Sequence, residues 1–215
     1  MHAVDRRPIA SRDTRWAHTS ARWLQAQGAS PNGISIASIF CSLLAAMCLF
    51  CGMHAAIWQG RMLLLIAALL IVARLICNLL DGLVAVEGGM QSPGGAVYND
   101  LPDRISDAVT LLGVGYSISA WSWAVDLGWA AALFAVMTAY VRVLGGACGL
   151  PQRFSGPFAK QQRMLVIIVA AVLCADLPVP WQQWTMLAAL LLVTFGSALT
   201  VVLRTRAILR DLAAQ

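Results

Sequence analysis

Six long apolar stretches, separated by short polar breaks, follow one another from residue 33 to residue 203. Each holds about 17–23 residues, the length that an α-helix needs to cross the hydrocarbon core of a bilayer. Gly and Pro, which interrupt helices, mark several of the breaks. The pattern therefore predicts an all-α integral membrane protein with six transmembrane helices. The predicted spans are 33–53, 62–84, 104–123, 128–148, 163–179 and 182–203.

The composition agrees with this pattern. Hydrophobic residues make up 60% of the chain and charged residues only 12%, about half of what soluble domains carry. The formal net charge is +5, and the basic residues gather at the edges of the predicted spans. Lipid headgroups and phosphates are therefore the expected partners, and nucleic acid is not.

The first 28 residues are polar and basic and lack the pattern of a signal peptide. Between Arg12 and Gln27, Trp16 and Trp23 lie seven residues apart, each beside an Arg. This spacing predicts an amphipathic helix on the cytoplasmic leaflet, and a disordered polar tail is the alternative. We predict three parts, namely this segment at 1–29, a six-helix membrane domain at 30–205 and a cytoplasmic tail at 206–215.

The distribution of basic and aromatic residues predicts the orientation in the membrane. With six spans, the basic segments before the first span, between the fourth and fifth, and after the sixth all fall on one side. By the positive-inside rule that side is cytoplasmic, so both termini and the loop between the second and third spans are expected there. The opposite loops carry an interfacial aromatic belt of Trp58, Trp121, Trp123, Trp129, Trp181 and Trp184.

Acidic residues concentrate in one short region at the predicted cytoplasmic edge of the membrane. Five of the chain's ten lie there: Asp81, Glu87, Asp100, Asp103 and Asp107. Ionisable groups in such places are energetically costly and are usually retained for function. The region is therefore the candidate active site.

Oxygen-bearing side chains in this region recur at helical spacing. Asn78 and Asp81 form a stripe on the second span, and Asn99, Asp103 and Asp107 form another at the third. Two helices that face each other with such oxygens make a site for a hard cation such as Mg²⁺, Mn²⁺ or Ca²⁺. These five residues are the predicted metal ligands.

A simpler alternative is that the acids only stabilise a helix N-terminus through its dipole. Asp100 and Asp103 fit this alternative, with Pro102 expected in the first turn of the third span, where its missing N–H costs little. Asp81 and Asp107 do not fit it, because they are expected a turn or more inside their helices. Helix-end charge therefore does not account for the whole cluster.

The same region resembles the signature of the CDP-alcohol phosphotransferase family, D-x2-D-G-x2-A-R-x8-G-x3-D-x3-D. Laid without gaps on residues 78–103, its spacing matches throughout and its identity fails at three positions. Asn78 and Asn99 stand at the first and third Asp, and Val86 stands at the Arg. This pattern is similar to a divergent bacterial branch. The matching residues are Asp81, Gly82, Ala85, Gly95 and Asp103.

Two other stretches support the resemblance. Ser30-Pro31-Asn32-Gly-Ile-Ser35 is similar to the family's PN-x-[IV]-[ST] entry to the first span, and residues 155–163 resemble a GPM-x-K-x-x-R stretch of several branches. Where the chain departs from the signature, other residues stand near. The charges lost at the two Asn would be restored by Asp100, Asp107 or Glu87, and the lost Arg by Arg74 or Arg104.

The resemblance implies a membrane enzyme of phospholipid biosynthesis. It would transfer a phosphoalcohol group from a CDP-alcohol, such as CDP-diacylglycerol, to an acceptor alcohol and release CMP, with Mg²⁺ or Mn²⁺ as cofactor and as a homodimer. Asp103 would accept the proton of the attacking hydroxyl, with Asp107 as the alternative base. Gly82, Ala85 and Gly95 would leave room for the cytidine diphosphate. The candidate phosphate-binding residues are Arg142, Arg153, Lys160 and Arg163.

Several alternatives stay open on the sequence alone. Arg142 could form an ion pair between helices, and the basic residues at 153–163 could be ordinary positive-inside charge. A non-catalytic relative that binds lipid or nucleotide would also fit the Asn substitutions. A small cation transporter is disfavoured, because Asp126 and Asp176 lie at the outer edge and the other spans hold almost no acids. The acceptor alcohol cannot be identified from the sequence.

Overall fold

The computed structural model describes residues 14–90, 94–152 and 154–214, and all regular structure within these ranges is α-helical. The prediction of an all-α protein is therefore confirmed. The described helices are α1 (Arg15–Ala26), α2 (Pro31–His54), α3 (Ile57–Glu87), α4 (Gly95–Ser117), α5 (Ala124–Ala147), α6 (Lys160–Asp176) and α7 (Val179–Ala213).

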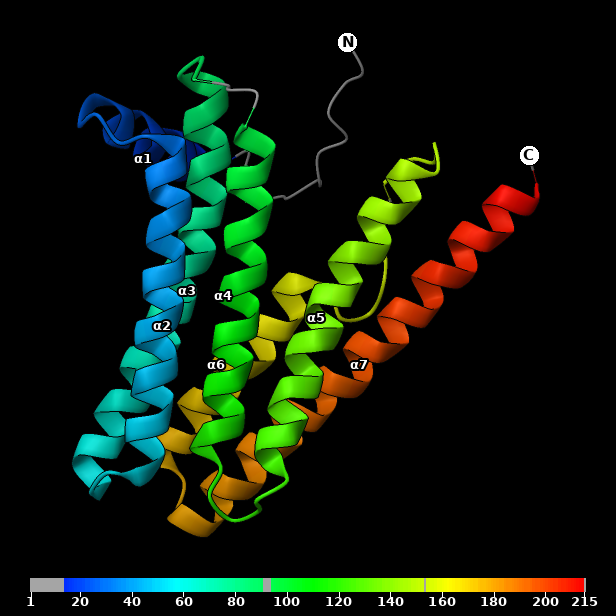
Figure 1. Cartoon of the computed structure of the whole chain (residues 1–215). Helices are drawn as coiled ribbons and strands as arrows, with labels where there is room; N and C mark the ends of the chain where they lie inside the picture. Colours follow the sequence, from blue (N-terminus) through cyan, green and yellow to red (C-terminus); the bar gives the residue numbers. More distant parts are fainter. Residues whose placement is uncertain (1–13, 91–93, 153, 215) are drawn as a thin grey trace.

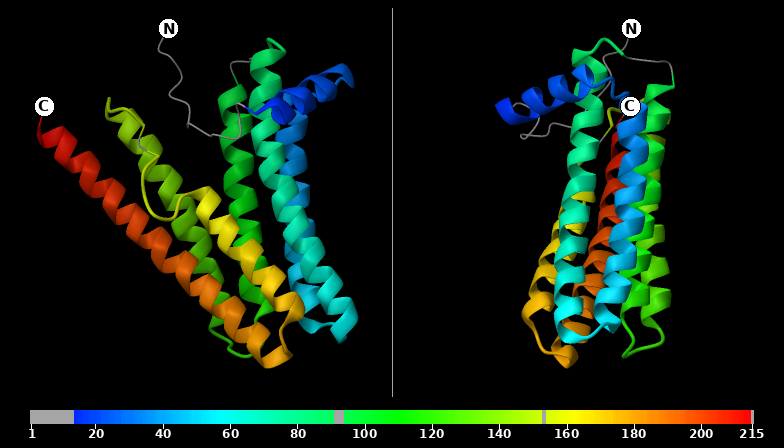
Figure 2. Two further views of the ribbon diagram at one scale, coloured as in Figure 1. Left: turned by 180° about the vertical axis from the view of Figure 1, so that it is seen from behind. Right: turned by 90° about the vertical axis from the view of Figure 1, so that its left-hand side faces the viewer.

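Helices α2 to α7 form a closed ring. Contacts run from α3 to α2, then to α4, α5, α7 and α6, and from α6 back to α3. Figures 1 and 2 show α2, α3 and α4 side by side, while α5 and α7 diverge from them towards the end that carries α1 and the C-terminus. The short helix α6 begins part-way along the bundle (Figure 1), so its first residues lie between the two groups of helices.

Apolar composition identifies an integral membrane protein. By length and hydropathy, α2, α3, α5 and α7 are each able to cross a bilayer. Large apolar side chains such as Phe40, Leu69 and Phe195 are more than 60% exposed, an arrangement that suits contact with lipid rather than water. The two other predicted spans correspond to α6, which has 17 residues, and to α4, which carries much of the acidic region.

Close contacts between glycines and alanines hold α4 against its neighbours. A Cβ built on Gly115 of α4 would lie 2.9 Å from the Cα of Gly128 on α5, closer than real Cβ contacts come. Small residues at such crossings let membrane helices approach closely, where van der Waals contact and not the hydrophobic effect drives association. The register of α4, and of the acids it carries, is thereby fixed from its far end.

The position of α4 differs from the predicted third span. The helix runs from Gly95 to Ser117, whereas the span was predicted at 104–123. The expectation that Pro102 lies in the first turn is wrong, because Pro102 lies inside the helix. The first turn holds no acidic residue, so Asp100 and Asp103 do not act as charges at the helix N-terminus.

Helix α1 lies outside the ring on α3. Its buried Ala17 and Ala21 pack against the apolar side chains at the end of α3. Nδ1 of His18 contacts Oε1 of Glu87, the last residue of α3. Glu87 is thus engaged by α1 and does not join the other acids of the cluster.

The opposite end of the bundle holds the turns between α2 and α3, α4 and α5, and α6 and α7 (Figure 1). The six Trp residues of the predicted belt lie in or next to these turns. One of the turns is tied to α7, because Oε1 of Gln183 accepts from the backbone N–H of Ser119 at 3.0 Å. At the other end α7 continues without interruption to Ala213, through most of the segment predicted as a tail.

Candidate active site

Asp81 of α3 is 3% exposed, and among the predicted ligands only Asp107 is more deeply buried. Its Oδ2 accepts a hydrogen bond from Oγ of Ser35 on α2 at 2.5 Å. Its Oδ1 accepts from Nδ2 of Asn99 on α4 at 3.2 Å. Three helices of the ring therefore meet at this one carboxylate.

Asp103 of α4 is bonded by side chains of α3 and α6. Its Oδ1 accepts from Nδ2 of Asn78 on α3, and from Nζ of Lys160, the first residue of α6, at 2.5 Å. Its Oδ2 has Nη2 of Arg104 at 3.9 Å, beyond hydrogen-bond distance. The side chains of Asp103 and Lys160 are each 14% exposed. Oδ2 is therefore the oxygen of Asp103 with capacity left to accept a proton.

The segment that leads into α6 is anchored through its backbone. Nε of Arg204 on α7 donates to the carbonyl oxygen of Ser155 at 2.7 Å. Oγ1 of Thr200, also on α7, accepts from the backbone N–H of Phe158 at 3.0 Å. These bonds fix the point at which α6 starts, and with it the position of Lys160.

Asp107 lies apart from the other predicted ligands, between two buried arginines. Its Oδ1 accepts from Nη2 of Arg74 on α3, and its Oδ2 accepts from Nη2 of Arg163 on α6 at 2.7 Å. The three side chains are at most 1% exposed. Arg74 also contacts Sδ of Met164 at 2.8 Å, and Nη1 of Arg163 donates to Oγ1 of Thr138 on α5 at 3.2 Å. Both oxygens of Asp107 are thus occupied by strong donors.

Asp100 forms a separate ion-pair group at the surface. Its Oδ1 accepts from Nη2 of Arg104 at 2.9 Å and from Nη2 of Arg142 on α5 at 2.7 Å. The guanidinium of Arg142 lies 5.2 Å from the centroid of the Phe154 ring, within cation–π range. Arg104 therefore pairs with Asp100 on its own helix. Arg142 forms an ion pair between α5 and α4, which is the alternative to phosphate binding that the sequence analysis named for it.

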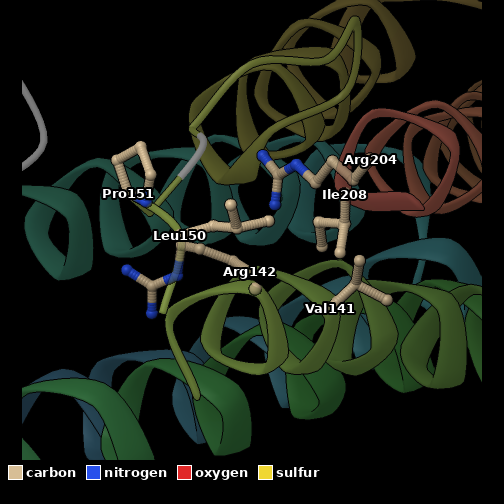
Figure 3. Close-up of a pocket in the computed structure, with 7 residues that line it drawn as sticks. Val141, Arg142, Leu150, Pro151, Arg204 and Ile208 are labelled. Carbon is tan, nitrogen blue, oxygen red and sulfur yellow. The ribbon is translucent and has the colours of Figure 1, made fainter. Parts of the chain in front are cut away.

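A small, partly open hollow lies beside Arg142 between α5 and α7. Figure 3 shows Leu150 between the guanidinium groups of Arg142 and Arg204. Arg204 donates to the carbonyl oxygens of Thr138 and Phe154 as well as to that of Ser155. The hollow is lined by Val141, Arg142, Gly145, Leu150, Pro151, Arg204 and Ile208.

The remaining predicted site residues flank the carboxylates. Gly82 and Ala85 follow Asp81 on α3 and are half-buried, so the backbone is approachable there. Gly95 is the first residue of α4. Arg153 lies outside the described residues.

The donor set of the group formed by Asn78, Asp81, Asn99 and Asp103 suits a hard divalent cation. Within the described residues no three His, Cys, Asp or Glu side chains gather as a metal-binding group, so two carboxylates act with two amides. Mg²⁺ is commonly held by one or two carboxylates, with substrate phosphates and water completing its shell. Each amide now points its N–H at a carboxylate, and rotation by half a turn would present its oxygen instead. These four side chains can therefore hold a divalent cation such as Mg²⁺ or Mn²⁺.

Most of the chain matches a known protein family. The model of the CDP-alcohol phosphatidyltransferase family matches residues 29–195, which includes the whole signature region. The chain belongs to this family. It is thus an enzyme that transfers substituted phosphate groups, a membrane phosphatidyltransferase of phospholipid synthesis, and the transporter alternative is set aside.

Two curated proteins are similar to this chain over most of their length. The inner membrane protein YnbA of Escherichia coli (strain K12) is 26% identical over 169 residues, covering 75% of this chain and 76% of YnbA. The phosphatidylinositol phosphate synthase of Mycobacteroides abscessus is 25% identical over 185 residues, covering 84% of this chain and 78% of the synthase.

Solved structures show the same fold. The phosphatidylinositol phosphate synthase PgsA1 of Mycobacterium tuberculosis with CDP-DAG bound superposes with a TM-score of 0.70 at 22% identity, covering 91% of this chain and 94% of PgsA1. The same protein in complex with manganese and citrate gives a TM-score of 0.70 at 22% identity, covering 89% and 88%.

Three residues that organise the site were not among the predicted site residues. Ser35 stands in the motif before the first span, so the resemblance offered a signal whose physical meaning is its hydrogen bond to Asp81. Arg204 looked like positive-inside charge, yet it is 6% exposed and binds backbone carbonyls. Thr138 gave no signal, because an isolated Thr in an apolar helix is common.

We expect Ser35→Ala to lower divalent-cation affinity and transfer activity by about 10–100-fold, as removal of a group that orients a ligand typically does. The hydroxyl of Ser35 holds Oδ2 of Asp81, and without it the carboxylate is free to rotate. Ser42→Ala is the matched control, since Ser42 is also buried on α2 but bonds the carbonyl of Ser38. Equal effects of the two substitutions on Mn²⁺ affinity would contradict the assignment.

Proposed function

We propose that the protein transfers the phosphatidyl group of CDP-diacylglycerol to an acceptor alcohol and releases CMP. The observation that carries this proposal is the convergence of Asp81 and Asp103 with Asn78 and Asn99 from two facing helices of the family signature. The bound CDP-DAG of the similar mycobacterial synthase supports the choice of donor. Both carboxylates keep their place in the structure, which argues against the non-catalytic alternative.

In the proposed reaction the acceptor hydroxyl attacks the phosphorus that carries the diacylglycerol. The new O–P bond forms as the bond between this phosphorus and the CMP phosphate oxygen breaks, and CMP leaves with both electrons. Oδ2 of Asp103 takes the hydroxyl proton as a general base. A bound Mg²⁺ or Mn²⁺ would neutralise the diphosphate and the leaving CMP.

The other site residues receive distinct proposed roles. Asn78, Asp81, Asn99 and Asp103 hold the cation, whereas Asp107 acts as part of the helix framework through its two arginines. Arg163 belongs to that framework and is not free for a phosphate. Gly82, Ala85 and Gly95 leave space for the cytidine diphosphate. Arg142, which is 16% exposed beside the hollow, is the proposed contact for an acceptor phosphate.

The proposed setting is a bacterial inner membrane with the active site at its cytoplasmic face. The positive-inside distribution of Arg and the Trp-rich turns at the opposite end support both termini in the cytoplasm. In this arrangement α4 and α6 complete six spans, and α1 lies on the membrane surface beside α3. Homodimer formation remains a prediction from the family resemblance.

The test is release of CMP from CDP-diacylglycerol by purified protein in lipid, with Mg²⁺ or Mn²⁺ and a panel of acceptors that includes inositol phosphate, glycerol phosphate and serine. We expect release that requires metal and one acceptor, and that is lost in Asp81→Ala. Binding of the CDP-alcohol without release for any acceptor would favour the non-catalytic alternative instead.

A further inference from the structure

Lys160 is the only lysine in a chain that uses arginine at its fourteen other basic positions. It contacts Oδ1 of Asp103, the carboxylate that is also bonded by Asn78. An ammonium is a compact point charge with three donors, so among oxygens it resembles a small cation more closely than a planar guanidinium does. We infer that the site formed by Asn78, Asp81, Asn99 and Asp103 takes a single divalent cation, which lies nearer to Asp81, and that the ammonium of Lys160 provides a second positive charge at Oδ1 of Asp103.

The contacts of the two carboxylates differ in the way this inference requires. Asp81 and Asp103 each accept one amide N–H from an Asn of the facing helix. The second donor at Asp81 is the neutral hydroxyl of Ser35, whereas the second donor at Asp103 is a cation. Asp81 therefore retains an unbalanced negative charge, and Asp103 is already neutralised.

The charge of the site leads to the same conclusion. The four ligand positions carry two negative charges, because two of them are Asn. One divalent cation together with Lys160 exceeds this by one charge, which a substrate diphosphate would more than balance. Two divalent cations beside the same lysine would exceed it by three in a partly buried site, where like charges repel strongly. The electrostatic cost thus favours single occupancy.

Lys160 does not depend on Asp103 for its position. The backbone before it is bonded by Arg204 and Thr200 of α7, and Nη1 of Arg163 donates to the carbonyl oxygen of Phe158 at 2.9 Å. Removing the ammonium would leave these bonds in place. A variant at Lys160 is therefore expected to keep the segment and to change mainly the charge at the site.

This inference rests on the proposed metal site and adds its stoichiometry. The first measurement is titration of the purified full chain, in neutral-lipid nanodiscs, with Mn²⁺ alone, using the paramagnetic resonance signal of free Mn²⁺ to count the bound ions. We expect about one Mn²⁺ per chain. Two bound ions would overturn the inference and leave the proposed function intact, whereas no bound ion would contradict the metal site itself.

The second measurement compares Lys160→Met with wild type. Loss of a positive charge next to the site should tighten Mn²⁺ binding at least about tenfold, while CMP release falls because the second positive charge is gone. Arg206→Met, which removes an exposed charge from α7, is the matched control and should change neither quantity. A lysine that acted only as a structural tether would not tighten Mn²⁺ binding, so unchanged or weaker binding in Lys160→Met would overturn the inference.

A gain-of-site variant supplies an independent result. Asn78→Asp combined with Lys160→Met restores one negative charge and removes the competing ammonium beside Asp103. We expect this variant to bind a second Mn²⁺, close enough to the first to broaden its resonance. A single bound ion in this variant would show that Lys160 does not occupy a cation position, and would overturn the inference.

Discussion

Replacing Asp103 by Asn is expected to reduce CMP release by about 10²–10⁴-fold, the range in which removal of a general base falls. The substitution keeps the size and most hydrogen bonds of the side chain but removes the oxygen that would accept the hydroxyl proton. Because an amide still ligates a cation weakly, the rate is to be measured at saturating Mn²⁺, which separates loss of the base from weaker metal binding.

Asp126→Asn is the control for this experiment. Asp126 lies exposed in the first turn of α5, among the turns at the far end of the bundle, so the same chemical change there should leave the rate unaffected. If Asp103→Asn retained most of the activity at saturating Mn²⁺, the proton would have to pass to another group. Asp107 would not be that group without first breaking two buried ion pairs.

The helical architecture was largely predictable, because hydropathy alone separates long apolar segments from their breaks. The residue at which α4 starts could not be predicted in the same way. Asn99, Asp100 and Asp103 look like a polar membrane edge, so the predicted span began after them. In the structure the helix continues through all three, and their side chains bond to groups on α3, α5 and α6.

Four of the five predicted ligands, Asn78, Asp81, Asn99 and Asp103, come together in the structure, but their contacts could not be predicted from the sequence. Asp107 is eight positions after Asn99, which is about 12 Å along a helix, so one cation cannot reach both. The stripe therefore divides into a layer with Asn99 and Asp103 and a second layer in which Asp107 meets Arg74. The register of α4, which its close glycine contacts with α2 and α5 help to fix far from the site, decides which of its residues pair with those of α3.

The buried ion pairs of Asp107 with Arg74 and Arg163 are expected to contribute strongly to the stability of the protein. Asp107→Leu would leave Arg74 and Arg163 buried without their shared carboxylate, and breaking a buried pair in this way costs about 3–5 kcal/mol. The cost should be high here because Nε of each arginine already lacks a hydrogen-bond partner. We expect the thermal midpoint of the purified protein in detergent to fall by on the order of 10 °C.

The ion-pair framework can be distinguished from a ligand role by restoring stability without the charges. Arg74→Met, Asp107→Leu and Arg163→Met together remove all three charges, and apolar replacements of a buried ion-pair group are often neutral or stabilising. The triple variant should therefore recover most of the lost midpoint and still bind Mn²⁺, since Asp81 and Asp103 remain. Asp126→Leu, on an exposed helix turn, should cost less than about 1 kcal/mol. A triple variant that is stable but no longer binds Mn²⁺ would instead return Asp107 to the metal site, because a residue needed only for the framework is dispensable once the framework is rebuilt.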